Sequence, residues 1–399
     1  MEVTRNQIHV IYIHPHLERI GELFDQIWRL RNIYYDTKRY KITVIHPPID
    51  WRKRTNKTAH KILMKGLNVV HSIDGSLLWP QKIENLLATV VQESNCLYVL
   101  LSHPDLTISF AKKYYRKKPE YYCSLTDQEL EMGYRLRDKL NIPRSSPIVT
   151  LHVRGPEYTS DTDIHNYRNM NIENYIPAIN FLIDKGFYII RLGDKGMKRI
   201  VNAPSQFIDA PFHPAYNEFV DPYFIAISNF YIGCPSGPVS VARAFNVPIL
   251  SVNTIAVAAE CSADNELLLY KKWYSFQLKR NLTYEEMITS SCMSYYVNEC
   301  FLKSDIELIE NSPEEILVGI KEIIARLNNT YLEDDEVNRR VNNIRERVHF
   351  SRRHILHKNI QFKKIPCLPL FFLNAKISHE FIKLNPSFLG HKWEYDISI

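Results

Sequence analysis

Short apolar runs alternate with segments of helical periodicity through the middle of the chain, and this alternation restricts the possible folds most. The predicted strands are Ile148–Val153, Phe187–Leu192, Gln206–Ile208, Phe230–Ile232 and Pro248–Val252. The predicted helices between them cover residues 172–184, 196–201, 217–228 and 238–245. Strands that alternate with helices through short connections form a parallel sheet with helices on both faces. We therefore predict a doubly wound α/β sheet for this part.

The first 145 residues show the same alternation less clearly. Ile8–Ile13 is a β-rich run, and Leu17–Arg31 follows with apolar residues at helical spacing. Further strands are predicted at Asn68–Val70, Lys41–Ile45 and Leu97–Leu101, a helix at 124–140, and later helices at 313–327 and 334–349. A chain of 399 residues exceeds one ordinary core. We predict two Rossmann-like domains at 1–145 and 146–365, with a tail at 366–399 that packs back on the core.

Composition is that of a soluble globular protein, with 45% hydrophobic and 24% charged residues. The net charge of +6 is small for this length and gives no indication of a nucleic-acid partner. The seven cysteines form no C-x-x-C motif, so reduced thiols are expected. No signal peptide and no apolar run of membrane-spanning length is evident. We expect a cytoplasmic protein, with peripheral contact at the cytoplasmic face of the inner membrane left open.

The segment Ile148–Tyr158, IVTLHVRGPEY, changes abruptly from apolar to polar at the end of a predicted buried strand. Ligands of open α/β sheets bind just outside the carboxyl ends of strands. There Arg154 could grip a phosphate through two parallel hydrogen bonds, with His152 beside it. The alternative is an arginine that pairs with a carboxylate and only holds the loop.

A second anion-suited turn is predicted at Ile232–Ala244, IGCPSGPVSVARA. Pro238 suits the first position of a helix, which places Ser236 and Gly237 at its amino terminus. A serine-capped strand–turn–helix without a ligand is the alternative. Two such turns on one sheet favour a ligand with a diphosphate group.

Other polar residues at strand ends are weaker candidates. Arg191, Gly193 and Asp194 lie at the end of one strand. Arg191 could bind a phosphate or a carboxylate, and Asp194 could bind a ribose hydroxyl or cap the next helix. Asn253 follows the last strand of the alternating series and is a further donor-binding candidate.

The polar loop from Tyr158 to Asn169 is longer than a typical strand–helix connection, and such loops often carry function. It contains Asp161 and Asp163, but one D-x-D is common by chance, and we assign no metal. In the first half, His14 follows the first predicted strand, where a histidine could deprotonate an acceptor hydroxyl. A turn with an incidental histidine explains it equally well.

Two clusters, Trp51–Lys57 and Ala111–Tyr122, interleave basic and aromatic residues. Such a composition suits an anionic membrane surface or a lipid diphosphate. Stacking on single-stranded nucleic acid is a rival, and a solvated surface outranks both. No aromatic–glycine recognition motif accompanies the clusters, so we predict no nucleic-acid partner.

Three runs, LHVRGPEY, YRNMNIENYIPAINFLIDKGFYIIRLGD and FYIGCPSGPVSVARAFNVPILSVN, resemble a family of bacterial surface-carbohydrate glycosyltransferases, the enzymes of capsule and lipopolysaccharide synthesis. The tail segment 376–389 also resembles the end of that family, and His152-Val153-Arg154 is distantly similar to the H-x-R motif of fucosyltransferases. The resemblance covers roughly 125–260 and is weak over the first 120 residues. Gly155-Pro156 departs from the fucosyltransferase pattern, so donor identity is not transferred.

The resemblance implies a GT-B fold, in which two Rossmann-like domains face a cleft. The second domain holds the nucleotide-sugar donor, and the first holds a glycan or lipid-linked acceptor. In that scheme Arg154 contacts the donor diphosphate, the Ser236–Gly237 turn lies beside it, and Arg168, Asn169 and Tyr175 match the family's R-N…Y element.

The predicted function is thus a metal-independent, inverting transfer of a hexosyl or deoxyhexosyl group, with no cofactor because the nucleotide-sugar is a substrate. The catalytic base stays open among Glu157, Asp161, Asp163 and His14. The rivals are a sugar-nucleotide epimerase or hydrolase of the same fold and a non-catalytic nucleotide-sugar-binding module.

Overall fold

The computed structural model describes residues 8–14, 17, 19–49, 55–73, 89–93, 96–101, 106, 109–110, 113–114, 117–157, 165–255, 265–290, 298–358 and 375–390. The chain forms two compact units. Unit 1 comprises residues 1–152, 186–195 and 203–249, and unit 2 comprises 153–185, 196–202 and 250–399. The predicted domains at 1–145 and 146–365 are continuous segments, and their boundaries stay a prediction.

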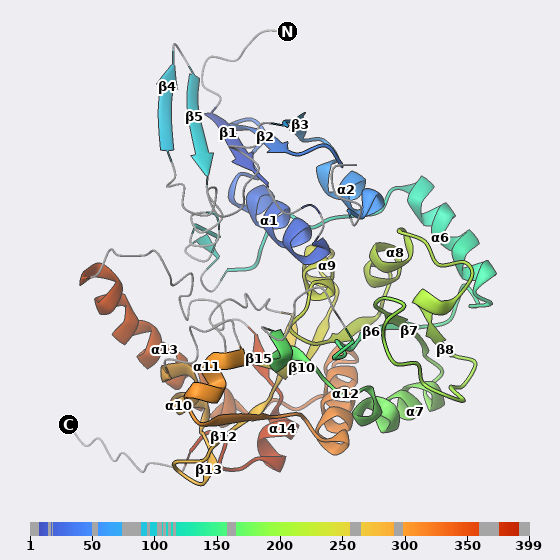
Figure 1. Ribbon diagram of the computed structural model, residues 1–399, viewed down its shortest axis with the longest axis vertical. Helices are drawn as coiled ribbons and strands as arrows, with labels where there is room; N and C mark the ends of the chain where they lie inside the picture. Colours follow the sequence, from blue (N-terminus) through green and yellow to red (C-terminus); the bar gives the residue numbers. More distant parts are fainter. Residues whose placement is uncertain are drawn as a thin grey trace. The chain divides into compact units, whose positions relative to one another are not determined.

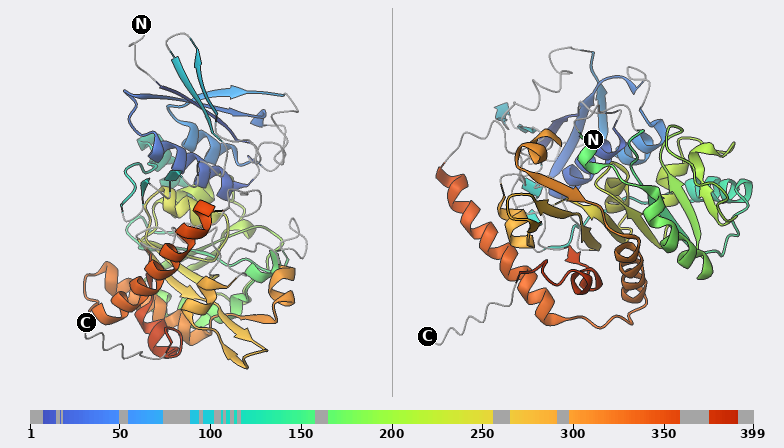
Figure 2. Two further views of the ribbon diagram at one scale, coloured as in Figure 1. Left: turned by 90° about the vertical axis from the view of Figure 1, so that its left-hand side faces the viewer. Right: turned by 60° about the horizontal axis from the view of Figure 1, so that its bottom comes forward.

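Unit 1 contains a five-stranded sheet with the order β3-β2-β1-β5-β4. The parallel strands are β1 (Ile8–Ile13), β2 (Tyr40–His46), β3 (Asn68–His71) and β5 (Cys96–Leu101), and β4 (Thr89–Glu93) pairs antiparallel with β5. Helices α1 (Ile20–Ile33) and α2 (Lys57–Met64) lie along the same face of this sheet (Figures 1 and 2). Helix α1 buries the apolar stripe that its sequence predicts, including Leu23, Ile27 and Leu30.

The same unit contains four further parallel strands, in the order β9-β6-β7-β8. They are β6 (Ile148–His152), β7 (Tyr188–Leu192), β8 (Phe207–Asp209) and β9 (Phe230–Gly233). The associated helices are α6 (Asp127–Lys139), the 3₁₀ helix η4 (Ala210–Phe212), α8 (Val220–Ala226) and α9 (Pro238–Ala244). Strands β6 and β9 are buried along their whole length apart from His152, so the polar residues that follow them mark the carboxyl edge of the sheet.

Unit 2 contains three neighbouring strands in the order β10-β11-β15, of which β10 (Ile249–Thr254) begins one residue before the unit. It also contains a three-stranded antiparallel sheet in the order β13-β12-β14. Its other strands are β11 (Glu266–Tyr270), β12 (Lys272–Ser275), β13 (Arg280–Asn281), β14 (Ile306–Ile309) and β15 (Lys376–Ile377). Its helices are η3 (Ile172–Tyr175), α7 (Ile176–Asp184), α10 (Tyr284–Thr289), α11 (Asn298–Lys303), α12 (Pro313–Leu327), α13 (Asp335–Lys358) and α14 (His379–Leu384).

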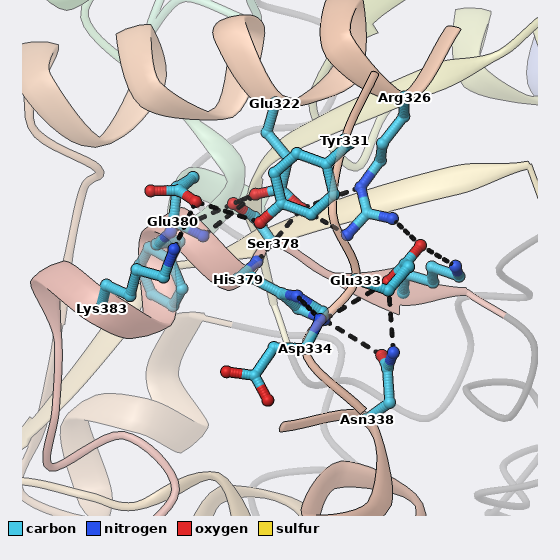
Figure 3. Close-up of polar contacts among 12 residues, drawn as sticks. Glu322, Arg326, Tyr331, Glu333, Asp334, Asn338, Ser378, His379, Glu380 and Lys383 are labelled. Carbon is cyan, nitrogen blue, oxygen red and sulfur yellow. Dashed lines mark hydrogen bonds and ion pairs between the residues drawn. The ribbon is translucent and has the colours of Figure 1, made fainter. Parts of the chain in front are cut away.

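The C-terminal part of unit 2 is tied together by polar contacts as well as by strand pairing. Strand β15 pairs in parallel with β11, and α14 follows it directly. The side chain of Glu322, on α12, lies among donors from the start of α14 (Figure 3). This contact joins two helices that are about 50 residues apart in the sequence.

The predicted α/β class with parallel strands is confirmed. Most predicted strands and helices form within a few residues of their expected ends, because buried strands and amphipathic helices carry strong local periodicity. The prediction of a short helix at 196–201 is wrong. These residues form turns, as the nearby Gly193, Gly196 and Pro204 favour. No helix in the described ranges is both long enough and apolar enough to cross a membrane.

Candidate functional site

His152 and Ser236 meet at the carboxyl ends of two neighbouring parallel strands of unit 1. His152 ends β6, and Ser236 lies in the turn between β9 and α9. The His152 Nε2 atom lies 3.1 Å from Ser236 Oγ, and its Nδ1 lies 3.3 Å from the carbonyl oxygen of Leu192. A carbonyl oxygen only accepts, so in the neutral ring Nδ1 donates to Leu192 and Nε2 accepts the serine hydroxyl. The two predicted positions are thus joined directly.

Gly237, the next residue, makes a backbone contact with Gly21 in the first turn of α1. A Cβ atom added at Gly21 would lie 2.4 Å from the Gly237 Cα atom, which is closer than atoms pack. A Cβ atom added at Gly237 would lie 3.1 Å from the Gly21 nitrogen. Gly21 therefore has no room for a Cβ atom, whereas a Cβ atom at Gly237 would require a small shift of the Gly21 backbone. The turn beside Ser236 is thus packed closely against the start of α1.

Arg191 and Asp194, the other candidates at a strand end of unit 1, differ in burial and in partners. The Arg191 side chain is buried, and its Nη1 atom lies 3.2 Å from Asp209 Oδ1 on β8. Arg191 therefore has a structural partner in the neighbouring strand. Asp194 is exposed and follows Gly193, whose φ of 149° is a conformation that L side chains rarely adopt. The roles predicted for these residues in donor binding stay predictions.

An acidic residue that sequence reasoning missed lies after β8. The Tyr216 hydroxyl lies 3.3 Å from Asp221 Oδ1 at the start of α8, and burial raises the pKa of Asp221 to about 7. A carboxyl group that titrates near neutrality can donate or accept a proton. Its sequence context, an aspartate in the first turn of a helix, is common and gave no signal.

His14, at the end of β1, is buried beneath α1. The Gln26 amide Nε2 atom donates to Glu22 Oε2 at 2.6 Å, which leaves Gln26 Oε1 as the acceptor for the Tyr12 hydroxyl and for His14 Nδ1 at 2.9 Å. Because Oε1 only accepts, His14 carries a proton on Nδ1. Its Nε2 atom is then the basic position. Its predicted role as a catalytic base stays a prediction.

In unit 2, Arg154 lies directly against the segment 165–170. Its guanidinium Nη1 atom donates to the His165 carbonyl oxygen at 3.1 Å and to Asn169 Oδ1, and its own carbonyl accepts from the Met170 N–H at 2.9 Å. Arg154 and Asn169, two separately predicted donor-site residues, are thus in contact, and their roles in donor binding stay predictions. Tyr175, in contrast, is buried and directs its hydroxyl to the sulfur of Met170.

Lys271 was not predicted, and it holds the same segment. Its buried Nζ atom donates to the carbonyl oxygens of Tyr167 and Asn169, both at 3.0 Å. Lys271 immediately follows β11, a fully buried strand that sequence analysis did not predict. A lysine directly after the apolar run Leu267–Tyr270 is the signal that could have identified it.

The remaining predicted residues of unit 2 have different surroundings. Glu157 is half-buried, and a Cβ atom added at Gly155 would lie 2.0 Å from its Oε2 atom. Asn253 is buried, and its backbone N–H and side-chain Oδ1 bond reciprocally with Asn311 at 2.7 and 2.6 Å. Tyr158, Asp161 and Asp163 lie outside the described residues. Arg168 lies over the ring of Tyr167.

Neither basic cluster is described completely. Residues 51–54 and residues 111–112 and 115–116 lie outside the described ranges. In the second cluster, Lys113 Nζ donates to the Asn32 and Ile33 carbonyl oxygens, which ties this lysine to the end of α1. Among the residues with described positions, no three His, Cys, Asp or Glu side chains are grouped to hold a metal ion.

No protein-family model matches the chain, and no curated protein matches it in sequence. Among solved structures, a family 9 glycosyl transferase from Veillonella parvula is 10% identical over 66% of this chain and 86% of its own, with a TM-score of 0.40. The Escherichia coli ADP-heptose lipopolysaccharide heptosyltransferase II is 11% identical over 66% and 90%, with a TM-score of 0.38. The iron-containing dodecameric glycosyltransferase TibC from enterotoxigenic E. coli is 12% identical over 82% and 77%, with a TM-score of 0.38.

All three of these proteins are glycosyltransferases by name, and none of the three is a fucosyltransferase. The comparison gives no support to the H-x-R relationship. At this identity and TM-score, no substrate or residue role is carried over from them.

Proposed function

We propose that this protein is a GT-B glycosyltransferase that moves a sugar from a nucleotide-sugar donor to a surface-glycan or lipid-linked acceptor. The observation that carries the proposal is the hydrogen bond between His152 and Ser236 at the carboxyl ends of β6 and β9. It lies next to the close contact of Gly21 and Gly237. Polar side chains at the carboxyl edge of a parallel sheet suit the phosphates of a nucleotide.

Arg154 is the residue proposed to neutralise charge on the leaving diphosphate. A guanidinium supplies two parallel N–H groups and a fixed positive charge, and this is the task that a metal ion performs in other transferases. In this proposal the reaction therefore proceeds without a metal. Inversion at the anomeric carbon rests on the resemblance to a known family and not on a measured geometry.

The acceptor base is proposed among three residues. His14 has a defined basic nitrogen, Nε2, because Gln26 fixes the proton on Nδ1. Glu157 has a carboxylate and lies three residues after Arg154 in the sequence, and Asp161 follows four residues later. Histidine and carboxylate side chains are the groups that most often take a proton from an acceptor hydroxyl.

Binding of nucleoside diphosphates tests the donor part of the proposal. Thermal unfolding is measured with ADP, GDP, UDP and CDP separately. A ligand at 100 times its dissociation constant stabilises the folded protein by about 2.7 kcal/mol. One of the four is expected to raise the melting temperature, and its sugar derivative is then the donor to test for transfer.

Arg154→Ala is expected to abolish both this stabilisation and sugar transfer. Arg154→Lys keeps the charge but loses the paired N–H groups, so it should bind weakly and still fold. Arg144→Ala is the matched control, because Arg144 is exposed and pairs only at the surface with Asp138. Unchanged nucleotide binding and unchanged transfer in a folded Arg154→Ala protein would overturn the assignment. Net epimerisation of the donor without an acceptor would instead indicate an epimerase.

A further inference from the structure

Lys271 is a buried cation next to the segment 165–170, and strand pairing holds its backbone in place. It follows β11 directly, and its backbone N–H donates to the carbonyl oxygen of Thr254 at 2.9 Å, at the end of β10. Only 3% of the residue is exposed. The backbone of Lys271 is therefore held by two strands, and its buried ammonium group has little freedom to move.

The ammonium group reaches the segment 165–170 from the side of the sheet. It donates to the carbonyl oxygens of Tyr167 and Asn169, two residues apart in this segment. A lysine is well suited here, because one Nζ atom carries three donors.

Arg154 holds the same segment through other atoms. Its guanidinium donates to the His165 carbonyl oxygen and to the side chain of Asn169. Asn169 is thus the shared residue, since its carbonyl oxygen accepts from Lys271 and its Oδ1 accepts from Arg154. A displacement of Asn169 moves the acceptor that orients the guanidinium.

We propose that Lys271 is a positioning residue for Arg154 and sets the affinity for the donor diphosphate through Asn169. This inference rests on the proposed function of Arg154. Loss of the ammonium group removes the donor to the buried carbonyl oxygen of Tyr167 and to the half-buried carbonyl oxygen of Asn169, and buried acceptors are costly to deprive of a donor. The segment then moves to satisfy them, and Arg154 loses its orientation. Misplacement of a binding group by about 1 Å can cost roughly 100-fold in rate.

Lys271→Met tests the proposal, with the adjacent Lys272→Met as the matched control. Methionine fills a similar volume without donors. Lys272 is also partly buried, but its Nζ atom pairs with Glu315 on α12 at 2.7 Å. Both variants lose a lysine with a partner in unit 2, so both should lose some thermal stability. Only Lys271→Met is expected to weaken nucleoside diphosphate binding, by roughly 10-fold or more, measured by calorimetry well below the melting temperature.

The double variant with Arg154→Lys distinguishes positioning from direct contact. If Lys271 acts through Arg154, adding Lys271→Met to Arg154→Lys changes the dissociation constant much less than it does in the wild-type protein. Lys271→Arg keeps the charge and its donors and should recover part of the affinity. Full additivity in the double variant, or wild-type affinity in a folded Lys271→Met protein, would overturn the inference. Wild-type affinity in Arg154→Lys alone would overturn the proposed function instead.

Discussion

Glu322 is predicted to hold the C-terminal segment of unit 2 in place, and Glu322→Gln tests this. The residue is 1% exposed on α12. Its Oε1 atom accepts from Arg326 Nε and Nη2 at 2.9 and 2.6 Å and from the His379 N–H at 3.2 Å. Its Oε2 atom accepts from Ser378 Oγ at 2.5 Å and from the Glu380 N–H at 3.0 Å. Figure 3 shows these donors grouped around the carboxylate.

The geometry gives the expected size of the effect. Glutamine has one acceptor oxygen and one NH₂ group, so the donors at one of the two positions lose their acceptor whichever way the amide turns. The charge that pairs with the Arg326 guanidinium is lost as well, although Arg326 keeps Glu333. One unsatisfied buried N–H and one broken buried ion pair together cost about 3 kcal/mol. That corresponds to a rise of roughly 100-fold in the opening equilibrium of α14.

Hydrogen exchange followed by mass spectrometry measures this opening. Residues 376–384 of Glu322→Gln should exchange roughly 100-fold faster, since local opening controls exchange there. Glu336→Gln is the control, because Glu336 pairs with Arg339 at the exposed surface of α13. Wild-type exchange of residues 376–384 in the Glu322→Gln protein would refute the reasoning.

Two further predictions follow from other contacts. The Arg280 guanidinium pairs with Glu286 at 2.7 Å and lowers the pKa of that carboxyl from 4.5 to about 2. The ion pair therefore stabilises the folded protein above pH 4.5, and this stabilisation is lost as the pH falls toward 2. Carbon-13 NMR should find a Glu286 midpoint near 2 that rises toward 4.5 in Arg280→Met, and an unmoved midpoint would contradict this. Gly21→Ala should lower the melting temperature more than Gly237→Ala, because its Cβ would lie 2.4 Å from backbone and overpacking typically costs about 1–3 kcal/mol. Equal melting temperatures would exclude the close contact.

Local pattern was sufficient for much of the fold. Strands such as Ile8–Ile13 and helices such as Pro313–Leu327 form at the predicted residues, since their apolar spacing is a property of short windows. It also placed His152 and Ser236 at strand ends, and parallel pairing of β6 with β9 then brought them together. Several elements after residue 265 were not predicted, among them β11, β12 and α10.

The sequence by itself determined which residues end the parallel strands, because strand and helix formation depend on neighbours a few positions away. Only the tertiary structure decided what those residues touch. Arg191 on β7 pairs with Asp209 on the neighbouring strand β8, and Lys271 contacts a segment about 100 residues earlier in the chain. Such partners are selected by packing and by the need to satisfy buried polar groups, and neither leaves a mark in a local window.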